Sequence, residues 1–245
     1  MRFNPEDFGI KYDYLYEILA TTFSYNQFKK ELIPNTSCMG VRFKKNRKII
    51  VRTYPNTKTF QNLKSNGYFC INFIENVYLY TLAALKSTDS NKKQSILEEY
   101  YDYFDISRIK IIKNDFQHYF DVKKKEIPFI NQSWALIICK VNYEKIILSK
   151  NELGDINLSK FELDIITHKK YRESYKLFNR AENLILETII LATRLKIASN
   201  KDNKELVSAI YKDILKNKEK IERFSVNKDV IKSLESIERF VQIYL

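Results

Sequence analysis

The sequence contains very little glycine and histidine, with four glycines and two histidines among 245 residues. The glycines are too few and too scattered to form a GxGxxG or a GxxxxGK[ST] motif, which excludes the Rossmann turn and the P-loop. His118 and His168 form no HExxH motif and lie in polar segments. The sequence therefore gives little support for a catalytic triad that uses histidine. We expect a cofactor to supply any difficult chemistry.

Cysteine is also scarce. Cys38, Cys70 and Cys139 are widely spaced and odd in number, and they form neither a CxxC pair nor a zinc-binding spacing. We therefore expect no metal site, and we interpret each cysteine as a small buried apolar residue in a reducing compartment.

The sequence lacks a long apolar run. ALIIC (135–139) and TIILA (188–192) are far shorter than a membrane span, and the segment MRFNPEDFGI has no signal-peptide character. We expect a soluble, cytoplasmic protein that does not enter a membrane.

The net charge of +12, from 42 Lys+Arg against 30 Asp+Glu, permits binding to nucleic acid. The lysines, however, are spread along the whole chain, in a sequence that is also rich in Ile and Asn, as an AT-rich genome would produce. The densest cluster, KKNRK (44–48), falls where a hairpin turn is expected. A basic nucleic-acid-binding module therefore ranks well behind the other hypotheses.

The first two thirds of the chain read as strands with two short helices. Period-two and β-branched segments predict the strands, and Thr57–Ser65 and Val77–Leu85 read as helices. Residues 92–125 form a charged and aromatic insert with helical character near Ser95–Tyr103. The predicted strands are 13–23, 37–43, 48–54, 68–74, one within 133–149, and 161–167. This order predicts an α+β fold built on a small antiparallel barrel.

The last third of the chain has a helical period from Tyr171 onward, with three amphipathic segments. Phe178, Ala181, Ile185 and Ile189 share one face of the first. We expect two regions, a barrel domain at 1–170 and a helical region at 171–245 that packs on the barrel or on a partner subunit.

The junction between the third strand and the first helix concentrates groups that bind anions. Arg52 and Thr53 end the strand, and Thr57, Lys58 and Thr59 open the helix. Unpaired N–H groups and the positive end of the helix dipole point out of a helix start. Together with hydroxyls and two cations they could hold a phosphate without a glycine-rich loop. An ordinary N-cap with incidental charges is the alternative.

Several motifs in this order resemble those of the FMN-binding split barrels, and more closely those of an archaeal, largely methanogen, family of split-barrel flavoproteins of unknown function. The likeness runs from about residue 13 to 200 and rests on order and spacing. The insert at 92–125 and the helices after Leu195 depart from the family pattern. The matching motifs are Pro34–Asn35, Met39–Gly40–Val41, Arg52, Thr57–Lys58–Thr59, Asn62–Leu63, Ile71–Asn72–Phe73, Ala83–Ala84–Leu85, Ser133–Trp134–Ala135, Phe178–Asn179–Arg180–Ala181–Glu182 and Ala192–Thr193–Arg194–Leu195.

The resemblance implies an antiparallel split β-barrel with a C-terminal helical extension, and a homodimer with FMN at the subunit interface. It implies that the phosphate is held by Arg52, Thr57, Lys58 and Thr59, with the backbone around Thr53 near the ribityl chain and the ring edge. Met39 would pack on the ring and Asn72 would make a polar contact, with core filling and a satisfied turn amide as equal alternatives.

The hypothesis that follows is an FMN-dependent oxidoreductase or electron carrier that takes electrons from a nicotinamide or deazaflavin donor. No residue can be named as a catalytic acid or base. A non-catalytic protein that binds, stores or senses FMN is the second hypothesis, since fold does not fix function.

Overall fold

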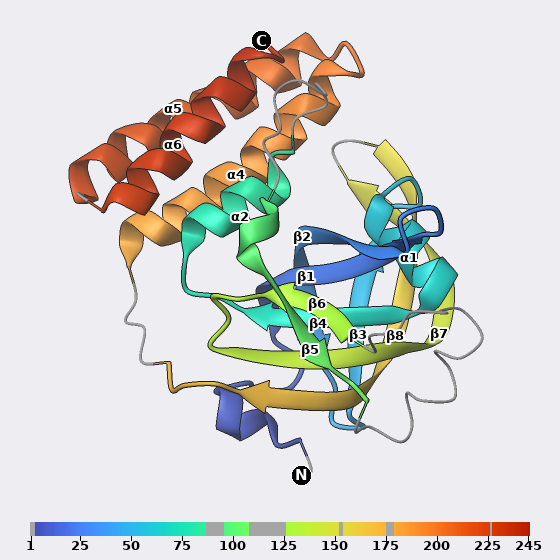
Figure 1. Ribbon diagram of the computed structural model, residues 1–245. Coiled ribbons are helices and arrows are strands. Elements are labelled where there is room, and N and C mark those ends of the chain that lie inside the picture. The colour runs from blue at the N-terminus through green and yellow to red at the C-terminus, as the bar shows by residue number, and fades with distance from the viewer. Residues whose placement is uncertain (1–2, 87–95, 108–125, 152–153, 175–178, 226) are drawn as a thin grey trace. The chain divides into compact units, whose positions relative to one another are not determined.

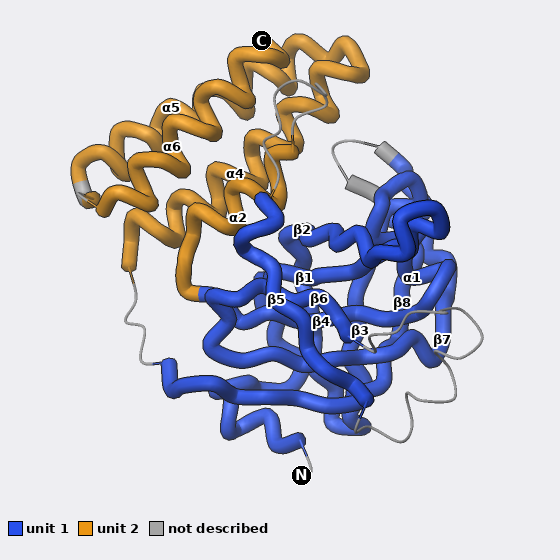
Figure 2. The backbone as a smooth tube through the Cα atoms, in the orientation of Figure 1, with its two compact units in different colours: residues 1–74, 97–149, 155–174 blue, residues 75–96, 150–154, 175–245 orange. Residues whose placement is uncertain are grey.

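The computed structural model describes residues 3–86, 96–107, 126–151, 154–174, 179–225 and 227–245. Two compact units are found in the chain, one made of residues 1–74, 97–149 and 155–174 and the other of residues 75–96, 150–154 and 175–245 (Figure 2). The second unit thus includes residues 75–96 as well as the C-terminal helices.

The first unit is a closed barrel of six strands in the order β1-β2-β3-β8-β7-β4, with a two-stranded sheet of β5 and β6 (Figure 1). Every strand pair with a known register is antiparallel. The elements are a 3₁₀ helix at Pro5–Phe8, β1 (Leu15–Asn26), β2 (Glu31–Phe43), β3 (Lys48–Thr53), α1 (Lys58–Asn66), β4 (Tyr68–Phe73), a 3₁₀ turn at Glu98–Tyr100, β5 (Tyr101–Asp105), β6 (Glu126–Ile130), β7 (Ala135–Asn151) and β8 (Gly154–Lys170).

The barrel interior and the outer face of β4 and β7 form two separate cores. Alternate residues of β4, such as Phe69 and Ile71, point into the barrel, whereas Tyr68 and Cys70 pack outward against Phe129 of β6. Because β5 and β6 cover that outer face, both faces of β4 are buried. This explains why YFCINF is an uninterrupted apolar strand rather than an alternating one.

The second unit consists of α2 (Val77–Ala84), α4 (Arg180–Ser199), α5 (Lys204–Phe224) and α6 (Lys228–Gln242). Helix α4 packs against α5, α6 and α2. Asn179, Asn203 and Asn227 cap the last three helices, each accepting a backbone N–H at the helix start. Ala181, Ile185 and Ile189, which were expected on the inner face of this helix, are buried, whereas Phe178 lies outside the described residues.

The structure confirms the split-barrel fold with C-terminal helices and the turn at 44–48, where the Lys44 N–H donates to the Lys48 carbonyl at 2.8 Å. The helical character expected near Ser95–Tyr103 is confirmed only for the 3₁₀ turn at Glu98–Tyr100 and is wrong from Tyr101 onward, where a strand pairs with β6. Of the insert at 92–125, residues 92–95 and 108–125 lie outside the described residues, as does His118. No described helix has the length and hydropathy that crossing a membrane requires.

Candidate functional site at the junction of β3 and α1

Strands β2 and β3 pair with each other along only part of the length of β2. Their ladder covers only Phe43↔Ile49, Arg42↔Ile50 and Val41↔Val51, although β2 extends to Glu31. Helix α1 follows β3 and packs against β1, β2 and β4. Leu63 and Phe60 of α1 reach the barrel core. The end of the barrel where β2 and β3 separate is therefore lined by the start of α1.

Thr57 caps helix α1. Its hydroxyl accepts the Phe60 N–H at 3.2 Å and donates to the Tyr54 carbonyl at 2.8 Å. The cap leaves the N–H groups of Lys58 and Thr59 directed out of the first turn, as at any helix start. Lys58 and Arg52 are both exposed. Neither cation has a hydrogen bond or an ion pair to a described residue, so both are available to an anion.

Thr59 connects the first turn of α1 to strand β2. Its hydroxyl accepts a hydrogen bond from the Asn35 amide at 3.2 Å and shares one with the Ser37 hydroxyl at 3.0 Å. One turn later, the Asn62 amide donates to the Thr22 hydroxyl at 3.0 Å. A row of polar side chains therefore connects α1 to β1 and to the separated part of β2. Sequence reasoning missed Ser37 entirely and treated Asn35 only as part of a motif.

Thr53 lies at the end of β3 on the face that points into the barrel, together with Ile49 and Val51. The residue is only 3% exposed, and among the described residues its hydroxyl has no hydrogen-bond partner. A buried hydroxyl without a partner costs about 1–3 kcal/mol, so such groups are rare in native proteins and call for an explanation. A ligand atom at this position would supply the missing partner.

Met39 and Asn72 come from two other strands, β2 and β4. Met39 is half-buried and packs against the barrel core. Asn72 is fully buried on the outer face of β4, where its amide nitrogen donates to the Leu19 carbonyl at 2.9 Å and to the Thr21 hydroxyl at 3.0 Å. Its amide oxygen accepts the Ile130 N–H at 2.8 Å. These contacts connect β6 to β1 and β4. They use both the donor and the acceptor of the Asn72 side chain within the protein.

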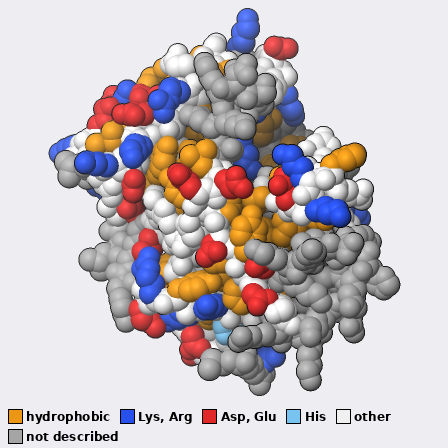
Figure 3. All heavy atoms as spheres, viewed as in Figure 1, with side chains coloured by type: hydrophobic (Ala, Val, Ile, Leu, Met, Phe, Trp, Pro, Cys, Tyr) orange, Lys and Arg blue, Asp and Glu red, His pale blue; other side chains and the backbone are white. Residues whose placement is uncertain are grey.

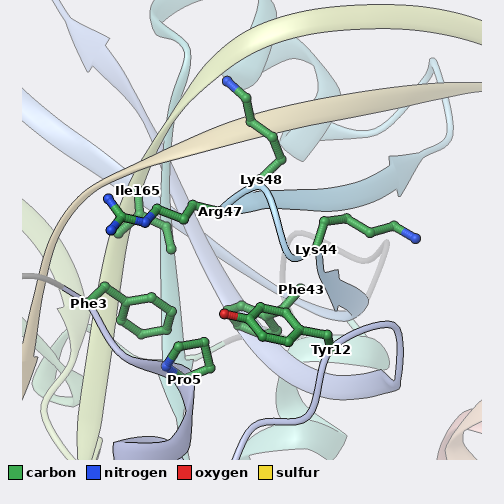
Figure 4. A pocket seen from close by; sticks show the side chains of 8 residues that line it. All are labelled: Phe3, Pro5, Tyr12, Phe43, Lys44, Arg47, Lys48 and Ile165. Atoms are coloured by element: carbon green, nitrogen blue, oxygen red, sulfur yellow. The ribbon is translucent and has the colours of Figure 1, made fainter.

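A second candidate position is a small hollow at the opposite end of β3, lined by residues that include Phe3, Arg47 and Ile165. Thr53 lies five residues from Lys48, which is roughly 17 Å along a strand. In Figure 4 the Arg47 side chain extends toward the Ile165 side, whereas the amine ends of Lys44 and Lys48 point away from the aromatic rings. Ion pairs join Lys44 to Asp13 and Lys48 to Asp164. The hollow has a volume of about 10 Å³, far below the ~300–1,000 Å³ typical of ligand pockets.

The remaining chemistry of the described residues is sparse. They contain no group of three or more His, Cys, Asp or Glu residues that could hold a metal ion. Burial lowers the pKa of His168, which makes edge contacts with the rings of Phe3 and Phe8. On the face seen in Figure 3, acidic and basic side chains are interspersed rather than gathered by sign. The junction is therefore the candidate site with the most anion-binding groups.

Comparison with known proteins agrees with this fold. Residues 16–168 match the family model described as "Protein of unknown function (DUF447) N-terminal domain". An uncharacterized protein of Methanocaldococcus jannaschii, MJ1453, is 24% identical over 200 residues, covering 80% of this chain and 84% of that protein.

Among solved structures, the FMN-bound protein MM1853 of Methanosarcina mazei, from the same family, matches with a TM-score of 0.64 and 15% identity. The match covers 97% of this chain and 100% of that chain. The flavin reductase HpaC in complex with NADP⁺ matches with a TM-score of 0.42 and 18% identity, over 66% of this chain and 81% of the other. The resemblance seen in the sequence is confirmed: this chain belongs to the DUF447 family of split-barrel proteins.

Proposed function

We propose that this protein binds FMN and that the phosphate of FMN is held at the β3–α1 junction. The observation that carries the proposal is that Arg52 and Lys58 are exposed cations without partners among the described residues, on either side of the turn that leads into α1. Helix α1 adds the free N–H groups of its first turn. The family relative MM1853, described as FMN-bound, supports the same cofactor.

The residues at the junction fit this cofactor in chemical terms. Arg52 and Lys58 would neutralise the phosphate, with Arg52 able to make a bidentate contact. Thr59, held by Asn35 and Ser37, would present its hydroxyl or its N–H from a fixed position. Bound FMN would supply redox chemistry, whereas the chain would bind it, orient it and limit solvent access.

We propose an FMN-dependent oxidoreductase or electron carrier, with a nicotinamide or a deazaflavin as electron donor. A protein that only stores or senses FMN is the alternative. Stopped-flow mixing of the FMN-loaded protein with each electron donor distinguishes these two functions. Reduction at a useful rate supports turnover, and flavin that stays oxidised with every donor supports the storage or sensing role.

We also propose that the protein works as a homodimer. Strand β7 pairs with β4 only over Ala135–Lys140, and its continuation carries Tyr143, Ile146 and Leu148, which are 53%, 68% and 57% exposed. A two-stranded ribbon with exposed apolar side chains is marginal in water unless something covers it. A second copy of the chain is the partner that a split barrel with an interface cofactor would need.

The cofactor proposal is tested by the absorption spectrum of the purified protein and by titration of the cofactor-free protein with FMN. A flavin spectrum, with FMN released on denaturation, supports the proposal. Arg52→Gln should weaken FMN binding by about tenfold or more, because a charge-assisted hydrogen bond contributes roughly 1.5–3 kcal/mol. Lys45→Gln, which removes the same charge at the exposed hairpin tip, serves as control. Equal FMN affinity in the two variants would remove Arg52 from the site.

A further inference from the structure

We infer that Tyr101 of strand β5 is a positioning residue for the phosphate site, because its hydroxyl holds the segment of β2 that contacts Thr59. The inference rests on the proposed binding of FMN at the β3–α1 junction. Tyr101 lies in the insert at 92–125, outside every motif that resembles the split-barrel family, and the comparisons assign it no role.

The first part of β2, residues 31–40, pairs with a strand along one edge only. Its ladder with β1 is continuous from Glu31 to Arg42, whereas the ladder with β3 covers only Val41–Phe43. In the described part of the chain, the second edge of this segment therefore has no strand partner. A segment paired along one edge opens more easily than one paired along both, so side-chain contacts on its two faces help to fix its position.

The two faces of this segment contact different elements. Because side chains alternate along a strand, Asn35 and Ser37 lie on one face and Thr36 lies on the other. The Asn35 amide donates to the Thr59 hydroxyl at 3.2 Å, and the Ser37 hydroxyl shares a hydrogen bond with it at 3.0 Å. The position of Thr59, in the first turn of α1, therefore depends on where this segment of β2 lies.

Thr36 makes the contacts of the opposite face. The residue is 1% exposed, and its hydroxyl takes part in two hydrogen bonds. One joins it to the Thr21 hydroxyl of β1 at 2.8 Å, and it accepts the other from the Tyr101 hydroxyl of β5 at 3.0 Å. Strand β1 already pairs with β2, whereas β5 belongs to the separate two-stranded sheet. Tyr101 thus connects this segment of β2 to the β5–β6 sheet.

Tyr101 is itself held on the barrel. It lies directly opposite Ile130 of β6, and the Ile130 N–H donates to the Asn72 amide oxygen of β4 at 2.8 Å. Burial raises the pKa of Tyr101 above its usual value, so the hydroxyl stays protonated and able to donate at neutral pH. The contacts thus form a continuous path from β4 through β6, β5 and β2 to the first turn of α1.

Loss of the Tyr101 hydroxyl should therefore change the phosphate site without disrupting the fold. Thr36 keeps its bond to Thr21, so its buried hydroxyl still has a partner. The segment of β2 loses a contact on its outer face, and Asn35 and Ser37 then hold Thr59 less firmly. A binding site that is less ordered before the ligand arrives binds that ligand more weakly, even when the changed residue does not contact it.

The test measures the preference for FMN over riboflavin, which lacks the phosphate, from dissociation constants obtained by flavin fluorescence. We expect Tyr101→Phe to lower this preference by about two- to tenfold, the range of one neutral hydrogen bond, and to leave riboflavin binding unchanged. Tyr103→Phe is the matched control and should match wild type. It removes a hydroxyl from the same strand, one that has no hydrogen bond to a described residue.

Variants of Thr36 show whether Tyr101 acts through this residue. Thr36→Ser keeps the hydroxyl and should keep the wild-type preference for FMN. Thr36→Val removes the hydroxyl and should lower the preference. Tyr101→Phe added to Thr36→Val should lower it no further, because the two changes break the same bond. Additive losses in the double variant would contradict the connection.

Three other outcomes would overturn the inference, and they differ in what they leave standing. If wild type prefers FMN to riboflavin and Tyr101→Phe keeps that preference, Tyr101 does not position the phosphate site and the proposed function stands. If Tyr101→Phe weakens FMN and riboflavin equally, its hydroxyl supports the barrel in general and not the phosphate site. If wild type binds no FMN, the proposed function itself fails. Thermal melting of the cofactor-free proteins sets a temperature at which every variant is folded.

Discussion

Thr53 of β3 and Ser159 of β8 lie directly opposite each other in the ladder of the two strands, and both residues are 3% exposed. The Thr53 hydroxyl is buried without a hydrogen bond to a described residue, which costs stability. A protein that folds in water tolerates this cost where a ligand removes it. Substitutions at the proposed site should therefore change both the free energy of unfolding and the affinity for the ligand, which distinguishes its residues from ordinary core residues.

Thr53→Val should stabilise the cofactor-free protein and weaken FMN binding. Valine keeps the shape of threonine and removes the unsatisfied hydroxyl, so we expect a gain of about 1 kcal/mol in the free energy of unfolding. Thr21→Val is the control, because the Thr21 hydroxyl bonds to Thr36 and Asn72 and its loss should be destabilising. Urea titration measures both variants. A destabilised Thr53→Val protein would contradict the absence of a hydroxyl partner.

Asn72→Ala should cost stability rather than cofactor affinity. The change leaves the Leu19 carbonyl and the Ile130 N–H without their side-chain partner, so we expect a loss of about 2–4 kcal/mol. Chemical unfolding measures this loss. FMN titration at a temperature where the variant is folded should give an unchanged dissociation constant, and a large loss of affinity in a folded variant would show that Asn72 contacts the cofactor.

Arg47→Gly should stabilise the hairpin between β2 and β3. Arg47 has φ of 63°, a left-handed conformation that costs a residue with a side chain roughly 1–2 kcal/mol. Glycine adopts it without that cost but gains entropy in the unfolded chain, so we expect a net gain of about 0.5–1 kcal/mol. Thermal melting checks this. A lower melting temperature would mean that the Arg47 side chain stabilises the hollow it lines.

The cysteines should resist alkylation in the folded protein. Cys70 and Cys139 are buried as expected, whereas Cys38 is only half-buried. Desolvation, and then the Glu17 carboxylate, raise the pKa of Cys38 to about 12, and burial raises the pKa of Cys70 and of Cys139. The thiolate is the reactive form, so labelling by iodoacetamide at pH 8 should be much slower than in urea, where all three thiols react.

The same shifts give a pH dependence of stability. A raised folded-state pKa means that the folded protein holds these thiol protons more tightly than the unfolded chain does. The resulting stability is complete below the unfolded thiol pKa of about 8.5 and is lost as the pH rises above it. Urea titrations at pH 7 and pH 10 measure the difference, and equal stability at both values would contradict it.

Ile146→Lys should shift the proposed dimer toward monomer. Ile146 is 68% exposed on β7, so the change should leave the monomer folded. In an interface the new charge would be desolvated at a cost of several kcal/mol. Light scattering after size-exclusion chromatography measures the mass, with Phe28→Lys on an exposed turn as control. A wild-type monomer at all concentrations would contradict the dimer.

Local patterns in the sequence predicted much of this fold. Alternation identified β3, and the helical period identified α4 from residues such as Ile185 and Ile189, because each pattern reflects one buried face. Strand β5 was missed because its partner β6 comes after residues 108–125 in the sequence, so no local signal marks Tyr101–Asp105 as a strand. The outward burial of Asn72 likewise depends on β6.

The candidate site, too, was predicted where it depends on local sequence and missed where it depends on tertiary contacts. Arg52, Thr53, Thr57, Lys58 and Thr59 were found because they are contiguous at one strand–helix junction. Ser37 was not, because its position depends on the contact between β2 and α1. That contact has no local signal in the sequence, since serines on strands are common and only the tertiary structure shows which of them contact α1.

The most direct test of the central claim is the ratio of the dissociation constants of riboflavin and FMN for the wild-type protein, measured at two salt concentrations. If the β3–α1 junction holds the phosphate, FMN should bind at least about a hundredfold more tightly than riboflavin, since two or more charge-assisted contacts are lost with the phosphate. That preference should shrink as salt screens the contacts. Equal affinities for the two flavins, or no binding of either, would contradict the account.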